Sequence, residues 1–429
     1  MGLGHARRGR LLLAVVPAHA AAVSFFRGDF PVGTHPTSVA VGNFNGGAPD
    51  LAVANEGSNN VSILLGNGFG QFSAGATVPV GSLPSSVVVG RFNADSFDDL
   101  AVASVGDDNI AIRLGDGSGG FTGTGTVSTG TNSDPRAIAI GDFNNDNKTD
   151  LISANQGSST VPILLGDGMG GFAQDTTPWA LSTTGPGAAA NPVAIAAIQL
   201  GGTTMTPDAN LDAVVASQTS DQLLSLFGDG TGEINGSGTN YTSGGIPGAD
   251  PSGVAVGSLN PASSNPGFAA EPDMLVANQG VDQVWPFYGR TDGTAFDPGG
   301  VEMTGADPSA IALGDLDGDG DQDGITANRG GGTATVILSD GNGDVTADTS
   351  SAVGSSPDAV ATGSFDGDSK ADAAVANYDS NFVTVLTSLQ PGPPPASPPP
   401  QTSATKKCKK KHKHHAAAAK KKCKKKKRR

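Results

Sequence analysis

The hexapeptide DLAVAN at Asp50–Asn55 decides the fold, because variants of it recur through most of the 429-residue chain. An acid, an apolar run and a closing Asn or Ser return six more times, at spacings of 49, 51, 62, 61, 50 and 49 residues. The other copies are DLAVAS from Asp99, DLISAN from Asp150, DAVVAS from Asp212, DMLVAN from Asp273, DGITAN from Asp323 and DAAVAN from Asp372. The chain therefore contains seven repeats of one unit.

Other features keep the same register in each repeat. A proline precedes every copy, and a strand-like run such as SVAVG or AIAIG follows that proline. A second run, such as VSILLG or VPILLG, comes after the Asn or Ser, and most copies then have a glycine-rich turn such as LLGDGMGGF. These patterns predict four short strands in each repeat. Because one small sheet cannot cover its own apolar faces, we predict an all-β fold, a seven-bladed β-propeller of four-stranded blades.

The last repeat lacks a fourth strand of its own. It stops after the run Val383–Leu386, whereas an unmatched segment, SFFRGDFPVG, precedes the first repeat. We expect residues near Phe25–Val32 to complete the last blade, so that the propeller comprises residues 23–390.

The two ends of the chain differ from the repeats in composition. Residues 1–22 have a basic start, an apolar run from Leu11 to Val16 and small residues around Ala18-His19-Ala20, which is the layout of a secretory signal peptide. Residues 391–405 are rich in proline and predict a semi-rigid linker. Residues 406–429 form a lysine-rich tail, which we expect to be disordered.

Charge is divided between this basic tail and an acidic body. The tail carries fifteen of the 26 Lys and Arg residues and no acid, so the rest of the chain has 11 basic residues against 41 acidic ones. A body this acidic is a poor nucleic-acid binder and a good candidate for binding cations. Both cysteines, Cys408 and Cys423, lie in the tail, where a disulfide or a zinc site with nearby histidines are open alternatives.

The segment before each repeated acid carries side-chain oxygens at alternate positions. It reads DLDGDGDQD from Asp315, DFNNDNKTD from Asp142 and SFDGDSKAD from Ser364, with oxygens at positions 1, 3, 5 and 9. Ca²⁺ takes roughly six to eight oxygen ligands in flexible geometry, and position 7 could add a backbone carbonyl. A bound divalent ion would also remove the repulsion among the acids. The pattern therefore favours a calcium loop.

Two other motifs fit these stretches poorly. An EF-hand loop needs a Glu at position 12 and flanking helices, but position 12 is Thr326 in the sixth repeat and Ser153 in the third, between strands. The runs at Gly115–Gly120 and Gly166–Gly171 match the glycine pattern of dinucleotide sites. A strand follows them where such a site requires a helix, so we interpret them as turns.

From Ser24 to Leu389 the copies resemble the FG-GAP, or VCBS-type, repeats of propellers like the integrin α-chain. The most specific part is the loop G-D-[FL]-[ND]-x-D-x-x-x-D followed by [LAGM]-x-x-A-[NS]. The resemblance implies a seven-bladed propeller with Ca²⁺ in the loops between strands. Carried over residue by residue, it implies two full ligand sets, a third set that lacks position 1, and a weaker fourth beside Arg91: Asp315, Asp317, Asp319 and Asp323; Asp142, Asn144, Asp146 and Asp150; Asp366, Asp368 and Asp372; Asn93, Asp95 and Asp99.

These observations predict a secreted or cell-envelope-associated, monomeric, calcium-binding propeller that binds a protein or glycan ligand at the cell surface. We predict that the protein is not an enzyme. The repeats contain a single histidine, His35, and neither a G-x-S-x-G nor an H-E-x-x-H motif. The alternatives are an extracellular lyase or hydrolase, which a cluster of His, Arg and Tyr in the central depression would favour, and a structural envelope protein anchored by the tail. We expect the tail to bind an anionic envelope polymer or lipid, and no specific nucleic acid.

Overall fold

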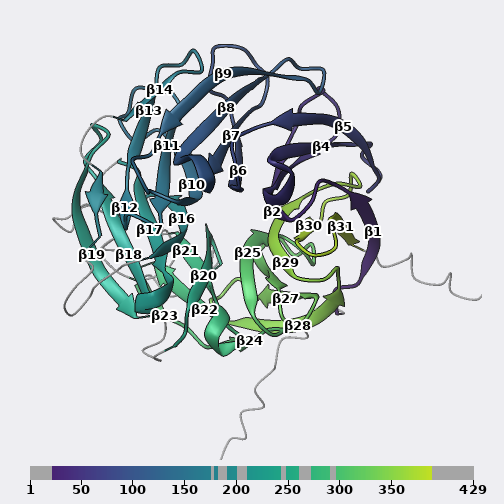
Figure 1. Cartoon of the computed structure of the whole chain (residues 1–429). Helices are drawn as coiled ribbons and strands as arrows, with labels where there is room; N and C mark the ends of the chain where they lie inside the picture. Colours follow the sequence, from purple (N-terminus) through teal and green to yellow (C-terminus); the bar gives the residue numbers. More distant parts are fainter. Residues whose placement is uncertain are drawn as a thin grey trace, which may run out of the picture. The chain divides into compact units, whose positions relative to one another are not determined.

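Each repeat forms one antiparallel sheet, and the seven sheets are arranged around a central channel (Figure 1). The computed structural model describes residues 22–174, 178–181, 191–200, 210–242, 248–259, 272–289 and 296–388. Within these ranges the helical residues are confined to four 3₁₀ turns: η1 (Glu56–Ser58), η2 (Val105–Asp107), η3 (Gln218–Ser220) and η4 (Gln279–Val281). The predicted all-β, seven-bladed propeller of four-stranded blades is confirmed. The predicted signal peptide lies almost wholly outside the described residues, and the linker and the tail lie outside them completely.

The first three blades follow one another along the chain, each running from the channel outward. Blade 1 consists of β2 (Pro36–Gly42), β3 (Asp50–Asn55), β4 (Asn60–Gly66) and β5 (Phe72–Pro79). Blade 2 consists of β6 (Pro84–Gly90), β7 (Asp99–Ser104), β8 (Asn109–Gly115) and β9 (Phe121–Ser128). Blade 3 has β10 (Pro135–Gly141) and β11 (Asp150–Asn155), then a third strand divided at Pro162 into β12 (Thr160–Val161) and β13 (Ile163–Gly166), and an outer edge of β14 (Phe172–Gln174) and β15 (Trp179–Ala180).

The remaining blades repeat this order, and the last one is completed by the N-terminal strand. Blade 4 consists of β16 (Pro192–Ile198), β17 (Asp212–Ser217), β18 (Gln222–Gly228) and β19 (Ile234–Thr242). Blade 5 consists of β20 (Pro251–Gly257), β21 (Asp273–Asn278), β22 (Gln283–Gly289), β23 (Phe296–Pro298) and β24 (Glu302–Met303). Blade 6 consists of β25 (Pro308–Gly314), β26 (Asp323–Asn328), β27 (Thr333–Ser339) and β28 (Val345–Ala352). Blade 7 consists of β29 (Pro357–Gly363), β30 (Asp372–Asn377), β31 (Phe382–Ser388) and β1 (Phe25–Pro31).

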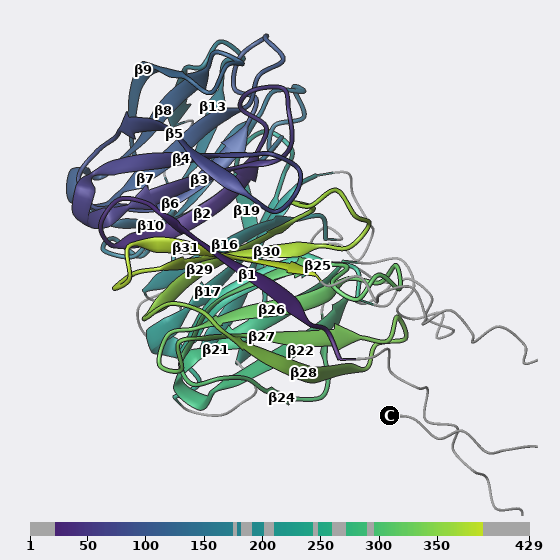
Figure 2. The same cartoon turned by 90° about the vertical axis from the view of Figure 1, so that its right-hand side faces the viewer.

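The ring closes because every inner strand contacts the inner strands of both neighbouring blades, including β2 of blade 1 with β29 of blade 7. At the outside, β1 runs antiparallel to β31, from Phe25 opposite Ser388 to Pro31 opposite Phe382. Figure 2 shows β1, in purple, beside the yellow-green strands of the last blade. Segments from the two ends of the repeat region therefore share one sheet.

The repeated hexapeptide is the second strand of each blade, and all six of its residues are buried in every copy. Successive side chains of a strand point to opposite faces, so one strand contacts both neighbouring blades. In blade 1, Leu51 and Val53 pack toward blade 7, whereas Ala52 and Ala54 pack against Leu100 and other residues of blade 2. Large side chains of one blade thus pack against the alanines of the preceding blade, which explains the alternation in DLAVAN.

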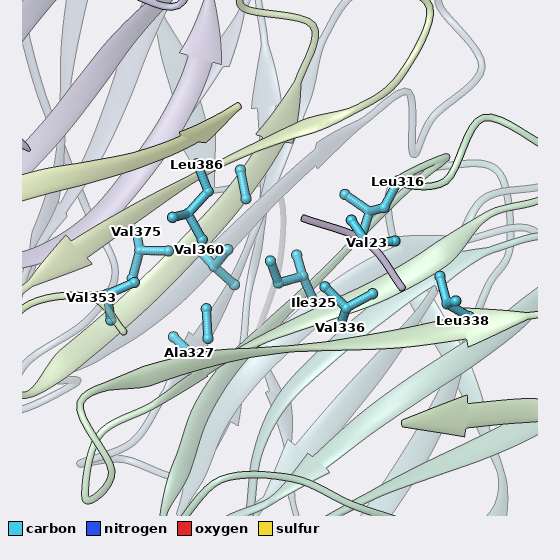
Figure 3. Packing of buried hydrophobic residues seen from close by; sticks show 12 residues of the cluster. Val23, Leu316, Ile325, Ala327, Val336, Leu338, Val353, Val360, Val375 and Leu386 are labelled. Atoms are coloured by element: carbon cyan, nitrogen blue, oxygen red, sulfur yellow. The ribbon is translucent and has the colours of Figure 1, made fainter. Parts of the chain in front are cut away.

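The core consequently consists of seven apolar layers, one between each pair of adjacent blades. Figure 3 shows the layer in which Ile325 and Val336 of blade 6 face Val360 and Val375 of blade 7. Val23, which precedes β1, packs in the same layer. Because each layer joins two different repeats, no repeat can bury its apolar surface alone.

Candidate metal loops and the mouth of the channel

The loop between the first and second strands of each blade is fixed by the acid that begins the hexapeptide. In blade 1, the two carboxylate oxygens of Asp50 accept hydrogen bonds from the N–H groups of Phe44 (2.9 Å) and Gly66 (2.8 Å). Equivalent pairs of bonds, between 2.7 and 3.0 Å, are made by the other six acids: Asp99, Asp150, Asp212, Asp273, Asp323 and Asp372. The acid therefore has a structural role in every blade, whether or not a metal binds.

The sixth loop brings three of its predicted ligands together. Oxygen atoms of Asp315, Asp317 and Asp323 all lie within 4.8 Å of one another, whereas Asp319 is exposed and stands outside this group. Burial raises the pKa of Asp323 to about 7, and the charges of Asp317 and Asp319 add to this effect against its backbone hydrogen bonds. Three converging oxygens and a destabilised negative charge fit a hard divalent cation.

The seventh loop forms a similar group from Asp366, Asp368 and Asp372, again within 4.8 Å. Burial raises the pKa of Asp372 to about 6, and Asp366 and Asp368 contribute further. Position 1 is Ser364, whose hydroxyl donates to the backbone carbonyl of Asp368 (2.9 Å). The missing acid at position 1 does not prevent the other three from converging.

The third loop is arranged differently, although its sequence matches the calcium pattern fully. Asp142 accepts hydrogen bonds from the N–H groups of Asp146 (3.0 Å) and Asn147 (2.8 Å). Lys148 lies 2.9 Å from Asp146 and forms an ion pair with it. Within the described residues, Asp142, Asp146 and Asp150 do not form a group of the kind seen in the sixth and seventh loops.

In the second loop, Arg91 does not bridge the predicted ligands. Its guanidinium lies 3.5 Å from Asp98, while the amide of Asn93 donates to Asp95 (2.8 Å). Asp99 keeps its two backbone bonds, and the side chains of Asn93 and Asp95 are hydrogen-bonded to each other. Most of the loops of blades 4 and 5 lie outside the described residues.

In the second, third and sixth loops the side chain at position 7 lies against the glycine turn of its own blade, and in the third loop Lys148 also forms an ion pair with Asp146. A Cβ atom on Gly117, Gly168 or Gly341 would lie within about 3 Å of Phe97, Lys148 or Asp321, respectively. Blade 7 has no glycine turn of its own, and there Lys370 packs against Gly318 of blade 6. The side chain of Asp321 is thus excluded from the proposed ligand set by its position.

The loops of blades 1 and 2 are also tied to the next blade. The buried ring of Phe44 contacts Phe121 of blade 2 edge to face (centroids 5.2 Å apart), and its carbonyl accepts a hydrogen bond from Gly119 (2.8 Å). The same pair of contacts joins Phe92 to Phe172 and Gly170 in blade 3. The glycine-rich segments Gly115–Gly120 and Gly166–Gly171 are therefore turns that contact the loop of the preceding blade.

The opposite end of the ring has a polar depression at the mouth of the channel, with a volume of about 290 Å³. It is lined by residues that follow the repeat proline, such as Arg136 and Asp358, and by residues that follow the hexapeptide, such as Glu56, Gln156 and Arg329. An inner strand of seven residues spans about 20 Å, so this mouth and the metal loops lie at opposite ends of the blades.

Sequence reasoning missed the residues of this mouth. Comparing the residue after the repeat proline across the copies would have found them, because it reads Thr, Ser, Arg, Val, Ser, Ser and Asp. The structural role of the acid in blades 4 and 5 was also missed, although Asp212 and Asp273 persist where the loop pattern is lost.

The seven sheets, each built from one sequence repeat, define a seven-bladed β-propeller. Residues 91–153 match the family model for an FG-GAP-like repeat, and the seven-bladed ring fits the FG-GAP propeller that the sequence predicts. The resemblance to FG-GAP repeat propellers is confirmed. No curated protein matches the chain in sequence.

Solved structures with the same architecture have diverse functions. Virginiamycin B lyase from Staphylococcus aureus is 14% identical, with a TM-score of 0.54, and the match covers 85% of this chain and 99% of that one. A streptogramin B lyase is 15% identical, with a TM-score of 0.54 and coverages of 85% and 98%. BBS1N, solved in complex with ARL6DN, is 14% identical, with a TM-score of 0.57 and coverages of 85% and 96%.

These similarities correct one expectation. The prediction that the chain is not an enzyme is wrong, because propellers of this architecture include lyases. A fold shared at such low identity assigns no reaction, since function depends on the site and not on the fold. The helices of the described residues include none that is long and apolar enough to cross a membrane.

Proposed function

We propose that the chain is a secreted, calcium-binding propeller that binds a protein or glycan ligand at the cell surface. The observation that carries the proposal is the convergence of Asp315, Asp317 and Asp323, with Asp366, Asp368 and Asp372 as a second group. Oxygen-rich loops of this kind suit Ca²⁺, which would hold each loop in one conformation and cancel the repulsion of its acids.

Thermal unfolding with and without calcium tests the metal. We expect Ca²⁺ to raise the Tm of the full chain relative to chelator, because a ligand at about one hundred times its Kd stabilises the folded state by about 2.7 kcal/mol. The variant Asp317→Asn should lose part of this rise, since the loop then has one anionic ligand fewer. Glu233→Gln, an exposed acid outside the loops, is the matched control and should keep the full rise. Equal Tm values in calcium and chelator would exclude the metal role.

The basic tail gives the proposal a second, separate component. Residues 406–429 combine fifteen basic residues with no acid, a composition that binds polyanions such as envelope polymers or anionic lipid. We expect removal of residues 402–429 to abolish retention on the cell envelope while leaving the calcium-dependent rise in Tm unchanged. Full retention of the shortened chain would rule out this role for the tail.

A second candidate function is catalysis at the mouth of the channel. The ring of His35 stacks on Tyr378 (centroids 4.4 Å apart, planes inclined by 5°). Burial raises the pKa of Tyr378, and its hydrogen bond to Glu56 raises it further. Glu56 and Arg329 line the depression, so acid–base groups lie beside a cavity, as a lyase or hydrolase requires. Conversion of an oligosaccharide that is lost in Tyr378→Phe would support this candidate, and unchanged turnover would oppose a role for Tyr378.

A further inference from the structure

The residue after the repeat proline normally joins one blade to the next at the mouth of the channel. The hydroxyl groups of Thr37, Ser85, Ser252 and Ser309 each donate to the carbonyl of the next blade's proline, at 2.5–2.8 Å. A Ser or Thr therefore satisfies the structural need at this position. The three copies that depart from it have Arg136, Val193 and Asp358, and all three residues line the depression.

The two arginines that line the mouth have different partners: one is paired with an acid and the other is held by a neutral amide. Arg329 forms an ion pair with Asp358. Arg136 instead donates from Nε to the side-chain oxygen of Gln156 (2.6 Å), and among the described residues it has no acidic partner. A guanidinium held by a neutral amide keeps its full charge and its remaining N–H groups, which suit the two oxygens of a carboxylate.

The rest of the lining offers hydrogen bonds and one apolar surface. The amide of Gln218 donates to Gln279 (3.0 Å), and amide groups can both donate to and accept from hydroxyls. Leu83 is 43% exposed and has a φ of 52°, a backbone conformation that bulky residues rarely adopt. At this position most other copies have Asp, Asn, Ser or His, so an exposed leucine beside the cavity is not required by the repeat.

We propose that the mouth binds a sugar that carries a carboxylate, such as a uronic acid unit, with the carboxylate on Arg136. The glutamines and the Arg329–Asp358 pair would bind its hydroxyls, and Leu83 would contact the apolar face of the sugar ring. The volume of about 290 Å³ lies near the lower end of small-molecule sites, which fits one or two sugar units. The inference names a ligand class for the binding role proposed above and rests on that role.

Calorimetric titration of the full chain with cellobiouronic acid, in calcium, tests the site. Cellobiose is the matched neutral sugar, and a glutamyl dipeptide is the matched acidic peptide. We expect one cellobiouronic acid to bind per chain, and each of the other two compounds to bind at least about tenfold more weakly. Equal binding of cellobiose would show that the carboxylate is not recognised, and equal or tighter binding of the dipeptide would assign the site to acidic peptides. Either result, or no binding of cellobiouronic acid, overturns the proposal.

The variant Arg136→Ser restores the hydroxyl that four copies already have, so it should fold with an unchanged Tm. We expect it to bind cellobiouronic acid at least about tenfold more weakly. Arg27→Ser removes the same charge on the outermost strand, far from the mouth, and should bind as the wild type does. Unchanged affinity in Arg136→Ser contradicts the proposal. The titration tests the mouth, whereas the calcium-dependent Tm tests the loops at the opposite end of the blades. A failure of the sugar proposal can therefore be distinguished from a failure of the calcium proposal.

Discussion

At the residue scale, the acid that opens each hexapeptide has two separable roles. It accepts two backbone N–H bonds in all seven blades, including blades 4 and 5, where the calcium pattern is lost. Where two further acids converge on it, at Asp323 and Asp372 among the described residues, it can also serve as a metal ligand. The acid alone therefore predicts a blade, whereas the acid together with acidic neighbours predicts a candidate metal site.

Replacing one of these acids should destabilise the propeller even where no metal is expected. The variant Asp50→Ala leaves the N–H groups of the buried Phe44 and the half-buried Gly66 without their acceptors. Each unsatisfied group costs about 1–3 kcal/mol, so we expect a loss of about 2–5 kcal/mol in the free energy of unfolding. Urea unfolding at fixed calcium measures it, with Glu233→Ala as the surface control. A loss no larger than that of the control would show that Asp50 has no such role.

The protonation of Asp50 should give stability a pH dependence. Burial raises its pKa above the ordinary value of 3.8, outweighing the hydrogen bonds from Phe44, Gly66 and Asn45. The folded chain then holds the proton more tightly than the unfolded chain, so this contribution is full below pH 3.8 and is lost as pH rises through the folded pKa. We expect the unfolding free energy of the wild type, relative to Asp50→Asn, to fall as pH rises above 3.8 and through the folded pKa. A difference that stays constant or rises would contradict the shift.

At the element scale, the end of the third strand lies close to the loop between the first two strands of the same blade. The third strand ends where it passes the loop of its own blade, and that close approach selects glycine. A Cβ atom on Gly66, Gly115, Gly166 or Gly228 would lie only 2.1–2.3 Å from a backbone carbonyl oxygen of the loop. Blades 6 and 7 have Ser339 and Ser388 at this position, so these two blades accept a side chain there.

An alanine at one of the tight positions should therefore be costly. In Gly115→Ala the new methyl group would lie 2.3 Å from the carbonyl oxygen of Asp98, so strand or loop must shift. Overpacking of this kind typically costs about 1–3 kcal/mol. Gly300→Ala is the control, because a Cβ atom there has nothing within 4 Å. Thermal unfolding should show a lower Tm for the first variant alone, and equal Tm values would mean that the loop adjusts freely.

The strands could be predicted well from the sequence because the same pattern occurs in each of the seven repeats. A proline at the start of the inner strand and an acid at the start of the next mark the same boundaries in every copy. Convergence of ligands was harder to predict, because it depends on rotamers and on neighbours such as Lys148, which pairs with Asp146 in the third loop. The mouth was not predicted, since its residues come from all parts of the chain and meet only in the closed ring.

At the scale of the whole molecule, the ring places the two candidate sites at opposite ends of the blades. The converging acids lie in loops at one end, and the mouth at the other end is lined by residues from all seven blades. The mouth depends on ring closure, and an apolar layer between blades 7 and 1 contributes to that closure. Closure in turn depends on β1, whose seven residues are the outer edge of the last blade.

Removal of β1 should open the ring's last blade and expose an unpaired strand. A chain that begins after Pro31 leaves the outer side of β31 unpaired from Phe382 to Ser388, although β30 still pairs with its inner side. It also lacks Val23, which packs between blades 6 and 7. Exposed edge strands pair with other chains, so we expect a lower Tm and concentration-dependent self-association, measurable by light scattering. A chain that lacks only residues 1–21 keeps the strand and should behave as the full chain does. If the chain without β1 remains monomeric with an unchanged Tm, the inner strands alone hold the ring closed, and the pairing of β1 with β31 adds no stability.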